Sequence, residues 1–358
     1  MALDTNSFVD GLIANGYTHL CVVPCSFAKN LINAVINNDE IEYIPSASEA
    51  VACSIASGLK MAGKKPIVIV QSSGVTNMGS SITSLLKPYG VTFPIMTSWR
   101  TYKDGDSEIQ HQHLATELPR LIEAYGYKHT ILNIENESTA LNQIDSCNTT
   151  ETICIIKKDS FSKVDLLEKH RLDLSNYIQR SEFLIKLNEM YQDSETLFIG
   201  TTGNTAREMY SFMPNTKNFY MAGNMGGALS LGLGASLAGK KVVVCGGDAE
   251  FVMHMGGLAT AGRYPDLDLT YILFDNEQNK STGGQNSYQS HVDYINIAKS
   301  SNLSTFDKVV ESLDIFTTVL KDNQQKSGLK FVCVKCGIDD ETPRPPLNIV
   351  KVSEFISL

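Results

Sequence analysis

The segment Lys-Val-Val-Val-Cys-Gly-Gly-Asp-Ala-Glu, residues 241–250, decides the fold. Its apolar half, residues 241–245, has the length and β-branched content of a buried strand. A second apolar run at 269–274 is followed by Asp-Asn-Glu-Gln at 275–278, and a helical pattern at 251–262 separates the two runs. Strand, helix and strand in this order predict a right-handed βαβ unit with parallel strands.

The same alternation of strands and helices extends over the whole chain. Strands are expected at residues 19–23, 41–44, 66–70, 91–96, 130–134 and 153–156, and again at 196–199, 217–220, 241–245, 269–274 and 329–334. A charged segment without apolar periodicity, residues 157–175, separates the two halves. The sequence therefore predicts an α/β protein of two doubly wound parallel-sheet domains, residues 1–165 and 179–358, joined by a linker at 166–178.

The composition excludes several classes of protein. Of the 358 residues, 42% are hydrophobic, and the formal net charge is −9. An acidic chain lacks the basic face that nucleic acids and membrane surfaces require. We expect neither a signal peptide nor a membrane span, since no run approaches the ~18 apolar residues that a span needs. The eight cysteines lie mostly in apolar runs, which is typical of reduced thiols in a cytoplasmic protein.

Polar side chains follow both strands of the βαβ unit. The carboxyl ends of parallel strands meet at one edge of a sheet, where doubly wound folds bind ligands. Mg²⁺ prefers hard oxygen ligands, so the predicted protein ligands are the Asp248 carboxylate, the Asn276 amide oxygen and the Gln278 backbone carbonyl. Gly246 and Gly247 would let a diphosphate approach the backbone. Each motif alone is ordinary loop sequence, and their order within one βαβ unit is what makes the pair specific.

These two motifs resemble the signature of the thiamine-diphosphate (ThDP) dependent decarboxylase superfamily, Gly-Asp-Gly followed by Asn-Asn. Two positions depart from it, because Ala249 stands for the last glycine and Asp275 for the first asparagine. The resemblance implies ThDP and Mg²⁺ as cofactors, with a pyrimidine-binding first domain and a diphosphate-binding second domain. The chain leaves no room for the middle domain of the longer members.

Glu49 is the candidate for the carboxylate that this family places beside the aminopyrimidine ring of ThDP. It follows the strand at 41–44 and opens a helix of apolar and small residues. The local sequence leaves an alternative, since Ser46-Ala-Ser-Glu49 matches a capping box with Ser46 as N-cap and Glu49 at the third helical position. The resemblance favours the catalytic role, in which Glu49 shares a proton with the ring nitrogen N1′.

Among the two-domain members, the chain resembles phosphonopyruvate decarboxylases and, more loosely, sulfopyruvate decarboxylases. The similar segments run along nearly the whole chain. They are Val23-Pro-Cys-Ser26, Gln71-Ser-Ser-Gly74, Trp99-Arg100, Glu108-Ile-Gln-His111, Thr201-Thr-Gly203, Asn224-Met-Gly226, Met253-His-Met-Gly256, Ser281-Thr-Gly-Gly-Gln285 and Arg344-Pro345.

The resemblance assigns roles to residues in both halves. Met225 would be the apolar wedge that bends ThDP, although without the resemblance it would be taken for a core methionine. His111 would donate or accept a proton near the substrate. The implied cofactor-binding residues are Glu49, Ser73, Gly74, Thr202, Gly203, Asn224, Met225, Gly247, Asp248, Ala249, Asn276 and Gln278.

The implied substrate is 3-phosphonopyruvate, which would lose CO₂ to give phosphonoacetaldehyde. A second anion on the substrate needs cationic and hydroxyl partners. The candidates for lining the substrate site are Ser26, Arg100, Lys280 and Gln285. The chain departs from the family at positions that would face the substrate, with Cys25 for aspartate, Gly227 for histidine and Asn279-Lys280 for a histidine-acid pair.

These departures keep three alternatives open. They are sulfopyruvate decarboxylation, ThDP-dependent carboligation of a related 2-oxo acid, and a non-catalytic paralogue that retains the fold. In this superfamily the pyrimidine-binding face of one chain meets the diphosphate-binding face of another. We therefore expect a homodimer or homotetramer with active sites between subunits.

Overall fold

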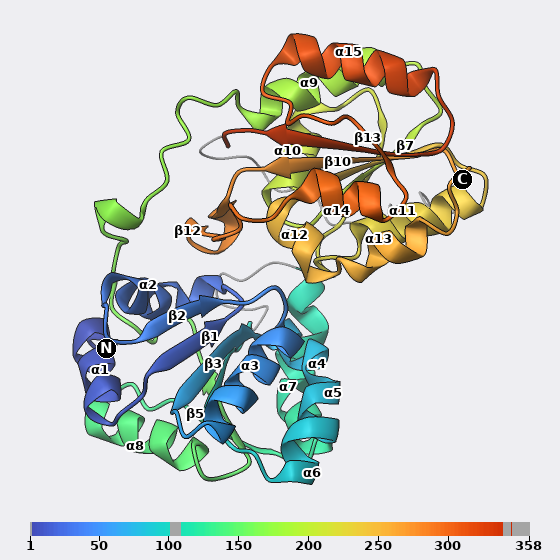
Figure 1. The fold of residues 1–358 in the computed structure, drawn as a ribbon. Helices are drawn as coiled ribbons and strands as arrows, with labels where there is room; N and C mark the ends of the chain where they lie inside the picture. The colour runs from blue at the N-terminus through green and yellow to red at the C-terminus, as the bar shows by residue number, and fades with distance from the viewer. Residues whose placement is uncertain (1, 101–108, 339–344, 346–358) are drawn as a thin grey trace. The chain divides into compact units, whose positions relative to one another are not determined.

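The computed structural model describes residues 2–100, 109–338 and 345. The chain forms two compact units (Figure 1). The first comprises Met1–Arg171 with Asn279–Asn286, and the second comprises Leu172–Gln278 with Ser287–Leu358. The boundary after Arg171 falls inside the segment at 166–178 that the sequence marks as a linker.

The first unit is built on a parallel sheet of six strands in the order β2-β1-β3-β4-β6-β5. Its register places Leu20 of β1 beside Ile67 of β3. The strands are β1 His19–Val22, β2 Glu42–Pro45, β3 Pro66–Gln71, β4 Ile95–Ser98, β5 Lys128–Ile131 and β6 Thr152–Ile156.

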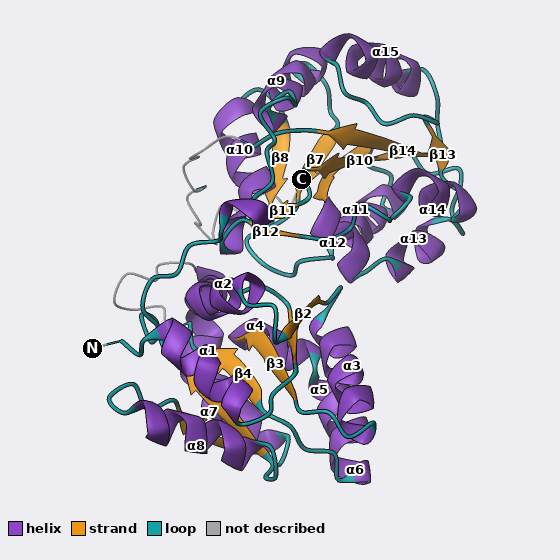
Figure 2. Ribbon diagram, turned by 60° about the vertical axis from the view of Figure 1, so that its left-hand side comes forward, coloured by secondary structure: helices purple, strands orange, loops and turns teal. Residues whose placement is uncertain are grey.

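Helices cover both faces of this sheet (Figures 1 and 2). Those packed on one face are α1 Thr5–Ala14, α2 Lys29–Asn37 and α8 Glu137–Cys147. Those on the other are α3 Glu49–Met61, α4 Ser72–Asn77, α5 Gly79–Ser81, α6 Lys87–Tyr89 and α7 Gln112–Ala124, with a π-helical segment Ile82–Leu86 between α5 and α6. Short 3-10 turns lie at Ser26–Ala28, Ile109–His111 and Glu168–His170.

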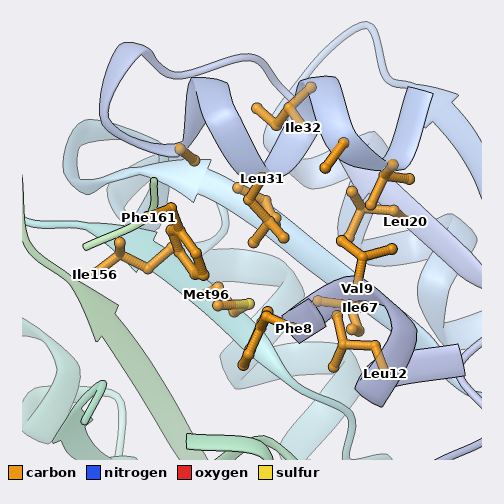
Figure 3. Close-up of a cluster of buried hydrophobic side chains, with 14 of the residues drawn as sticks. Phe8, Val9, Leu12, Leu20, Leu31, Ile32, Ile67, Met96, Ile156 and Phe161 are labelled. Carbon is orange, nitrogen blue, oxygen red and sulfur yellow. The ribbon is translucent and has the colours of Figure 1, made fainter. Parts of the chain in front are cut away.

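The two cores of the first unit are made by alternate residues of the same strands. On β1, Leu20 and Val22 point into the cluster beneath α1 and α2, whereas Cys21 points into the cluster beneath α3. Figure 3 shows the first of these clusters, in which Phe8 of α1 packs beside Phe161 with ring centroids 5.3 Å apart. A strand buried on both faces explains why the strands read as continuous apolar runs rather than as an alternating pattern.

The second unit repeats this architecture. Its six-stranded parallel sheet has the order β13-β14-β10-β9-β7-β8. Its strands are β7 Leu197–Gly200, β8 Lys217–Tyr220, β9 Val242–Gly247, β10 Leu269–Asp275, β13 Ser304–Thr305 and β14 Leu329–Lys335, while β11 Gln278–Asn279 and β12 Gln285–Asn286 pair separately. Numbered along the chain within each unit, both sheets have the order 2-1-3-4-6-5. The predicted pair of doubly wound domains is thereby confirmed, and the two domains share one topology.

The boundaries of the helices in the second unit follow the local backbone conformation and capping. The predicted helix at 251–262 is instead two helices, because the chain leaves the helical conformation at His254. The last helix begins at Leu313, where the Ser312 hydroxyl accepts a hydrogen bond from the Ile315 N–H. The helices are α9 Arg180–Tyr191, α10 Asn204–Phe212, α11 Ala228–Leu237, α12 Asp248–Met253, α13 Gly256–Ala261, α14 Tyr294–Ser300 and α15 Leu313–Gln324, and a 3-10 turn lies at Lys280–Thr282.

Across the described part of the chain, no helix combines the length and the apolar character needed to cross a bilayer.

Truncation of a strand residue that lies in the first core should destabilise the chain strongly. Ile69 of β3 is fully buried, so Ile69→Ala should lower the free energy of unfolding by about 2–5 kcal/mol, measured by urea titration. Ile131 of β5 is 41% exposed, and Ile131→Ala should cost less than about 1 kcal/mol. Equal losses in the two variants would contradict the described core.

Candidate active site

In the second unit, the predicted site residues follow four adjacent strands at the carboxyl edge of the sheet. Thr202 and Gly203 follow β7, and Asn224 and Met225 follow β8. The remaining predicted residues lie at the ends of the other two strands. Gly247, Asp248 and Ala249 lie at the end of β9, and Asn276 and Gln278 lie at the end of β10. This edge includes the point where the strand order reverses, which is where doubly wound sheets bind ligands.

Asp248 is a buried carboxylate at the centre of this edge. It is the first residue of α12 and is 4% exposed. The Ser287 hydroxyl donates a hydrogen bond to its Oδ2 at 2.9 Å. Burial, and next the charge of neighbouring Asp275, raise the pKa of Asp248 to about 7. A buried carboxylate beside a second carboxylate is suited to binding a cation.

Asp275, the departure from the family's first asparagine, is paired with a lysine. Lys335 at the end of β14 places its Nζ 3.0 Å from Asp275 Oδ2 and also contacts Glu277. The pKa of Asp275 is raised by burial, against the effect of Lys335. Nothing in the local sequence marks Lys335, since it reaches the site only through the pairing of β14 with β10.

Asn276 and Gln278 lie in the turn that leaves β10. Asn276 is 5% exposed, and its Oδ1 accepts a hydrogen bond from the Gln278 N–H at 3.3 Å. The Gln278 side chain donates to the Leu172 carbonyl at 3.4 Å. Glu277, between them, has a positive φ of 52°, so this turn is held in an unusual backbone conformation by its contacts.

The two glycines before Asp248 serve different purposes. A Cβ on Gly247 would meet no atom within 4 Å, so this position leaves open space beside the turn. A Cβ on Gly246 would lie 2.3 Å from Tyr271 Cε2 and 2.8 Å from Glu250 Oε2. Gly246 is therefore required by side chains of the protein itself, whereas the open space beside the turn lies at Gly247.

The loops after β7 and β8 are joined to each other. The Thr202 hydroxyl donates to the Ala222 carbonyl at 2.8 Å. Gly203 and Asn224 both have positive φ, at 91° and 56°. Met225 is only half-buried and belongs to none of the described hydrophobic clusters. Its position in a turn does not agree with the alternative of a core methionine.

Glu49 lies at the corresponding edge of the first unit. It is the first residue of α3, directly after β2, and is 5% exposed. Asn77 Nδ2 donates to Glu49 Oε2 at 2.9 Å. The capping-box alternative is wrong, because the N-cap is Ser48 and its hydroxyl accepts from the Val51 N–H. The Glu49 side chain points instead toward α4, where nothing in the local sequence marks Asn77.

Ser73 and Gly74 open α4 beside Glu49. The Gln71 amide donates to the Ser73 hydroxyl at 3.0 Å. A Cβ on Gly74 would lie 2.6 Å from Glu49 Cγ and 2.8 Å from Glu49 Oε1. Glycine at position 74 is therefore what allows the Glu49 side chain to occupy its place.

Ser26 and Arg100, predicted from strands far apart in the sequence, are in contact. Arg100 is 7% exposed, and its Nη1 donates to the Ser26 hydroxyl at 2.5 Å. The guanidinium lies 4.4 Å from the centre of the Phe27 ring. Beneath them, the Cys25 thiol donates to the Ser98 hydroxyl at 2.9 Å. The structure thus holds an orientated guanidinium at the ends of β1 and β4.

The other predicted residues that group with the first unit are His111, Lys280 and Gln285. His111 is 4% exposed and directly precedes α7. Lys280 and Gln285 belong to the segment 279–286 that groups with this unit. The fully buried Gln285 donates to Asn33 Oδ1 of α2 at 2.9 Å, so its amide is engaged in packing. Glu108 and Arg344, which completed two of the similar segments, lie outside the described residues.

Comparison with known proteins identifies the class to which this fold and site belong. Residues 5–117 match the thiamine pyrophosphate enzyme, N-terminal TPP binding domain, and residues 199–332 match the C-terminal TPP binding domain. Thiamine pyrophosphate is another name for ThDP. The chain belongs to the thiamine pyrophosphate enzyme family, and the recognition made from the sequence is confirmed.

Its relatives within the family are decarboxylases. A phosphonopyruvate decarboxylase of Streptomyces viridochromogenes is 26% identical over 96% of this chain and 92% of its own length. A sulfopyruvate decarboxylase of Methanosarcina acetivorans is 27% identical over 74% of this chain and 73% of its own length. The sulfopyruvate decarboxylase subunit beta of Methanocaldococcus jannaschii is 30% identical over 44% of this chain and 84% of its own length.

The described residues are suited to ThDP and Mg²⁺. Asp248 and Asn276 offer a buried carboxylate and an amide oxygen, which are hard ligands of the kind Mg²⁺ takes from proteins. Gly247 leaves space beside them for a diphosphate. Glu49 offers a buried carboxyl group at the carboxyl edge of the first sheet. The departure at Ala249 removes no side-chain oxygen from this set.

Substitution of Gly74 tests the placement of Glu49. Gly74→Ala should displace the Glu49 side chain, because the new methyl group would overlap its Cγ, and decarboxylase activity should fall by at least about tenfold. Gly58→Ala in α3 is the matched control, since a Cβ there meets no atom within 4 Å and should stabilise the helix by about 0.5–1 kcal/mol. Full activity in Gly74→Ala would contradict the described contact.

The pH dependence of stability tests the environment of Asp248. The folded chain holds a proton on this carboxyl group up to about pH 7, whereas the unfolded chain loses it near the ordinary value of 3.8. Stability should therefore fall as pH rises between these values, by up to about 1.4 kcal/mol per pH unit, and then level off. Urea unfolding without divalent cations should show a steeper decline in the native chain than in Asp248→Asn, where the raised pKa values of Glu250 and Asp275 still contribute. Parallel curves would mean that Asp248 titrates normally.

Proposed function

We propose that this protein is a ThDP- and Mg²⁺-dependent decarboxylase that converts 3-phosphonopyruvate to phosphonoacetaldehyde and CO₂. The observation that carries this proposal is the pair of buried carboxylates, Glu49 and Asp248, each at the carboxyl edge of its own doubly wound sheet. Similarity to a phosphonopyruvate decarboxylase over 96% of the chain supports the choice of substrate.

The second unit would hold the diphosphate and the metal. Asp248, Asn276 and the Gln278 carbonyl would bind Mg²⁺, and the open backbone at Gly247 would lie against the diphosphate. Met225, half-buried after β8, would contact the rings of ThDP. Lys335 would keep the additional carboxylate of Asp275 from competing for the metal, because it already neutralises that group. When bound, ThDP supplies the electron sink that accepts the electron pair left behind as CO₂ departs.

The first unit would supply the groups that move protons. Glu49 would hold a proton against N1′ of the aminopyrimidine ring. Asn77 donates to one carboxylate oxygen of Glu49 and so leaves the other free to face the ring. His111, buried before α7, would protonate the carbon from which CO₂ has left. Both residues act from buried positions, where a proton is transferred without competition from bulk water.

Arg100, Ser26 and Lys280 would bind the second anion of the substrate. The Arg100 guanidinium is already orientated by Ser26 and by the Phe27 ring, which lowers the entropy lost on binding. A guanidinium suits a phosphonate because it can donate two parallel hydrogen bonds to two oxygens. Cys25 in place of the family's aspartate leaves this surface without an additional negative charge.

Sulfopyruvate is the second candidate substrate, and the similarity to sulfopyruvate decarboxylases favours it. A sulfonate and a phosphonate have similar shapes, so the same arginine and hydroxyl would serve both. They differ in charge, because a phosphonate can carry two negative charges near neutral pH and a sulfonate carries one. The lysine at position 280, where the family has an acid, favours the more highly charged substrate.

The protein is proposed to act as a homodimer or homotetramer with active sites between subunits. Two helices that begin at the carboxyl edges present apolar residues to solvent in the single chain, Val51 and Met61 on α3 and Leu231 and Leu237 on α11. Such residues are typical of surfaces covered by a partner chain. A relative whose name is sulfopyruvate decarboxylase subunit beta supports assembly from more than one chain.

Product analysis tests the proposed reaction. The native protein with ThDP and Mg²⁺ should release CO₂ and aldehyde from 3-phosphonopyruvate faster than from sulfopyruvate or pyruvate. In Glu49→Gln the rate should fall by about 10²–10⁴-fold, because the group that holds the proton at N1′ is lost. The control is Glu40→Gln, an exposed glutamate that should leave the rate unchanged.

Other outcomes would redirect the assignment. Faster release from sulfopyruvate would support the second candidate. An acyloin in place of a free aldehyde would indicate a carboligase. Absence of turnover together with absence of ThDP binding would support a non-catalytic paralogue.

A further inference from the structure

Glu250 is a buried acid to which the proposed reaction assigns no part. It is the third residue of α12 and is 4% exposed. Tyr271 donates to its Oε2 at 2.6 Å, and the Ala228 N–H donates to its Oε1 at 3.3 Å. The backbone of Gly247 also forms a hydrogen bond with this carboxylate. Three groups from three separate segments thus converge on one side chain.

Two of these groups belong to the backbone at helix starts. Gly247 is the N-cap of α12, and Ala228 is the first residue of α11. Such N–H groups have no partner within their own helices. An acid at the third helical position commonly bonds back to the N-cap N–H of its own helix. Glu250 meets the backbone of Gly247 at the start of α12, and its Oε1 accepts from the Ala228 N–H at the start of α11.

The segments that Glu250 connects carry the proposed cofactor residues. The turn before Ala228 contains Asn224 and Met225, and Gly247 directly precedes Asp248. In that turn, a Cβ on Gly227 would lie 2.2 Å from Asn224 Nδ2, so the turn is closely packed on its own side chain. A movement of the Glu250 carboxylate would therefore be transmitted to both loops.

Tyr271 secures the third side of this arrangement. It is 1% exposed and packs between Phe251 and Phe331, with ring centroids 6.0 and 5.7 Å away. Its hydroxyl would be 2.6 Å from a Cβ on Gly246, so only glycine at that position lets Tyr271 reach Glu250. A buried carboxylate is costly unless several donors surround it, and the chain provides them here.

We propose that Glu250 is a positioning residue that sets the Asn224–Gly227 turn against the Gly247–Asp248 turn, so that the wedge and the metal ligand are held in one arrangement before ThDP binds. The part of this inference that concerns ThDP rests on the proposed function. The arrangement of the two turns is a property of the protein alone and is measured without cofactor.

The test combines hydrogen exchange with cofactor binding. In cofactor-free Glu250→Ala, amide exchange in the peptide 222–231 should rise by at least tenfold, while β9 and β10 stay protected. The Kd for ThDP, measured by calorimetry with Mg²⁺, should rise by about 10–100-fold, as for other groups that orientate metal ligands. In Glu250→Gln, the amide exchange of 222–231 and the Kd for ThDP should both return most of the way to the native values, because the glutamine side chain keeps an acceptor for the Ala228 N–H.

Two further variants separate positioning from stability. Tyr271→Phe removes one donor to Glu250 and keeps the aromatic ring, so it should fold even if Glu250→Ala does not. Its amide exchange in 222–231 and its Kd for ThDP should both rise, by less than in Glu250→Ala. Tyr191→Phe is the matched control, since Tyr191 is a 3% exposed tyrosine of the same unit that packs against Phe198. This control should change thermal stability without changing the Kd for ThDP or the exchange of 222–231.

The two proposals fail in different ways. Unchanged exchange of 222–231 and an unchanged Kd for ThDP in both Glu250→Ala and Tyr271→Phe would overturn the positioning role. A native protein that binds no ThDP would overturn the proposed function, while the exchange measurement would still decide whether Glu250 holds the two turns together.

Discussion

The burial of carboxylates at the ends of parallel strands is the constraint on which the rest of the site depends. A charge removed from water must be offset by donors or cations, or its pKa moves until the charge is lost. Glu250 and Asp275 are offset by the protein itself, through Tyr271 and two backbone N–H groups in one case and through Lys335 in the other. Asp248 accepts hydrogen bonds from Ser287 and from the backbone of its own turn, but the charge of Asp275 adds to the effect of burial and raises its pKa to about 7, which distinguishes it as the residue suited to a metal.

The shared strand order of the two units explains why their sites have similar positions. In each sheet the chain turns back after its second strand, and loops at the carboxyl ends of four adjacent strands carry the candidate residues. Glu49 opens a helix after the second strand of its unit, and Asp248 opens a helix after the third strand of its own. One architecture would thus present the proposed acid for proton transfer in one copy and the proposed acid for metal binding in the other, because the loops differ and the sheets do not.

The departures from the family signature have physical counterparts in the structure. Asp275 is accompanied by Lys335, so the added charge is matched by a cation on the neighbouring strand. Cys25 lies buried against Ser98, which makes a neutral contact where an aspartate would have needed a partner. Ala249 leaves the oxygen donors of the site in place. Each change is local: Asp275 and Ala249 lie outside the hydrophobic clusters of the second unit, and Cys25 fits into the cluster beneath α1 and α2 as a small apolar side chain.

The sequence by itself determined the two α/β domains, the strands of both sheets except β13, and the residues at the ends of β9 and β10. These features follow from apolar runs and turn residues, whose physical effect is local. Only the tertiary structure decided which side chains Glu49, Asp248 and Glu250 meet. Asn77, Ser287, Tyr271 and Lys335 come from other segments of the chain, and strand register and helix packing bring them into contact. The same distinction explains the capping box at Ser46, a valid local pattern that the chain did not use because Glu49 is directed toward α4.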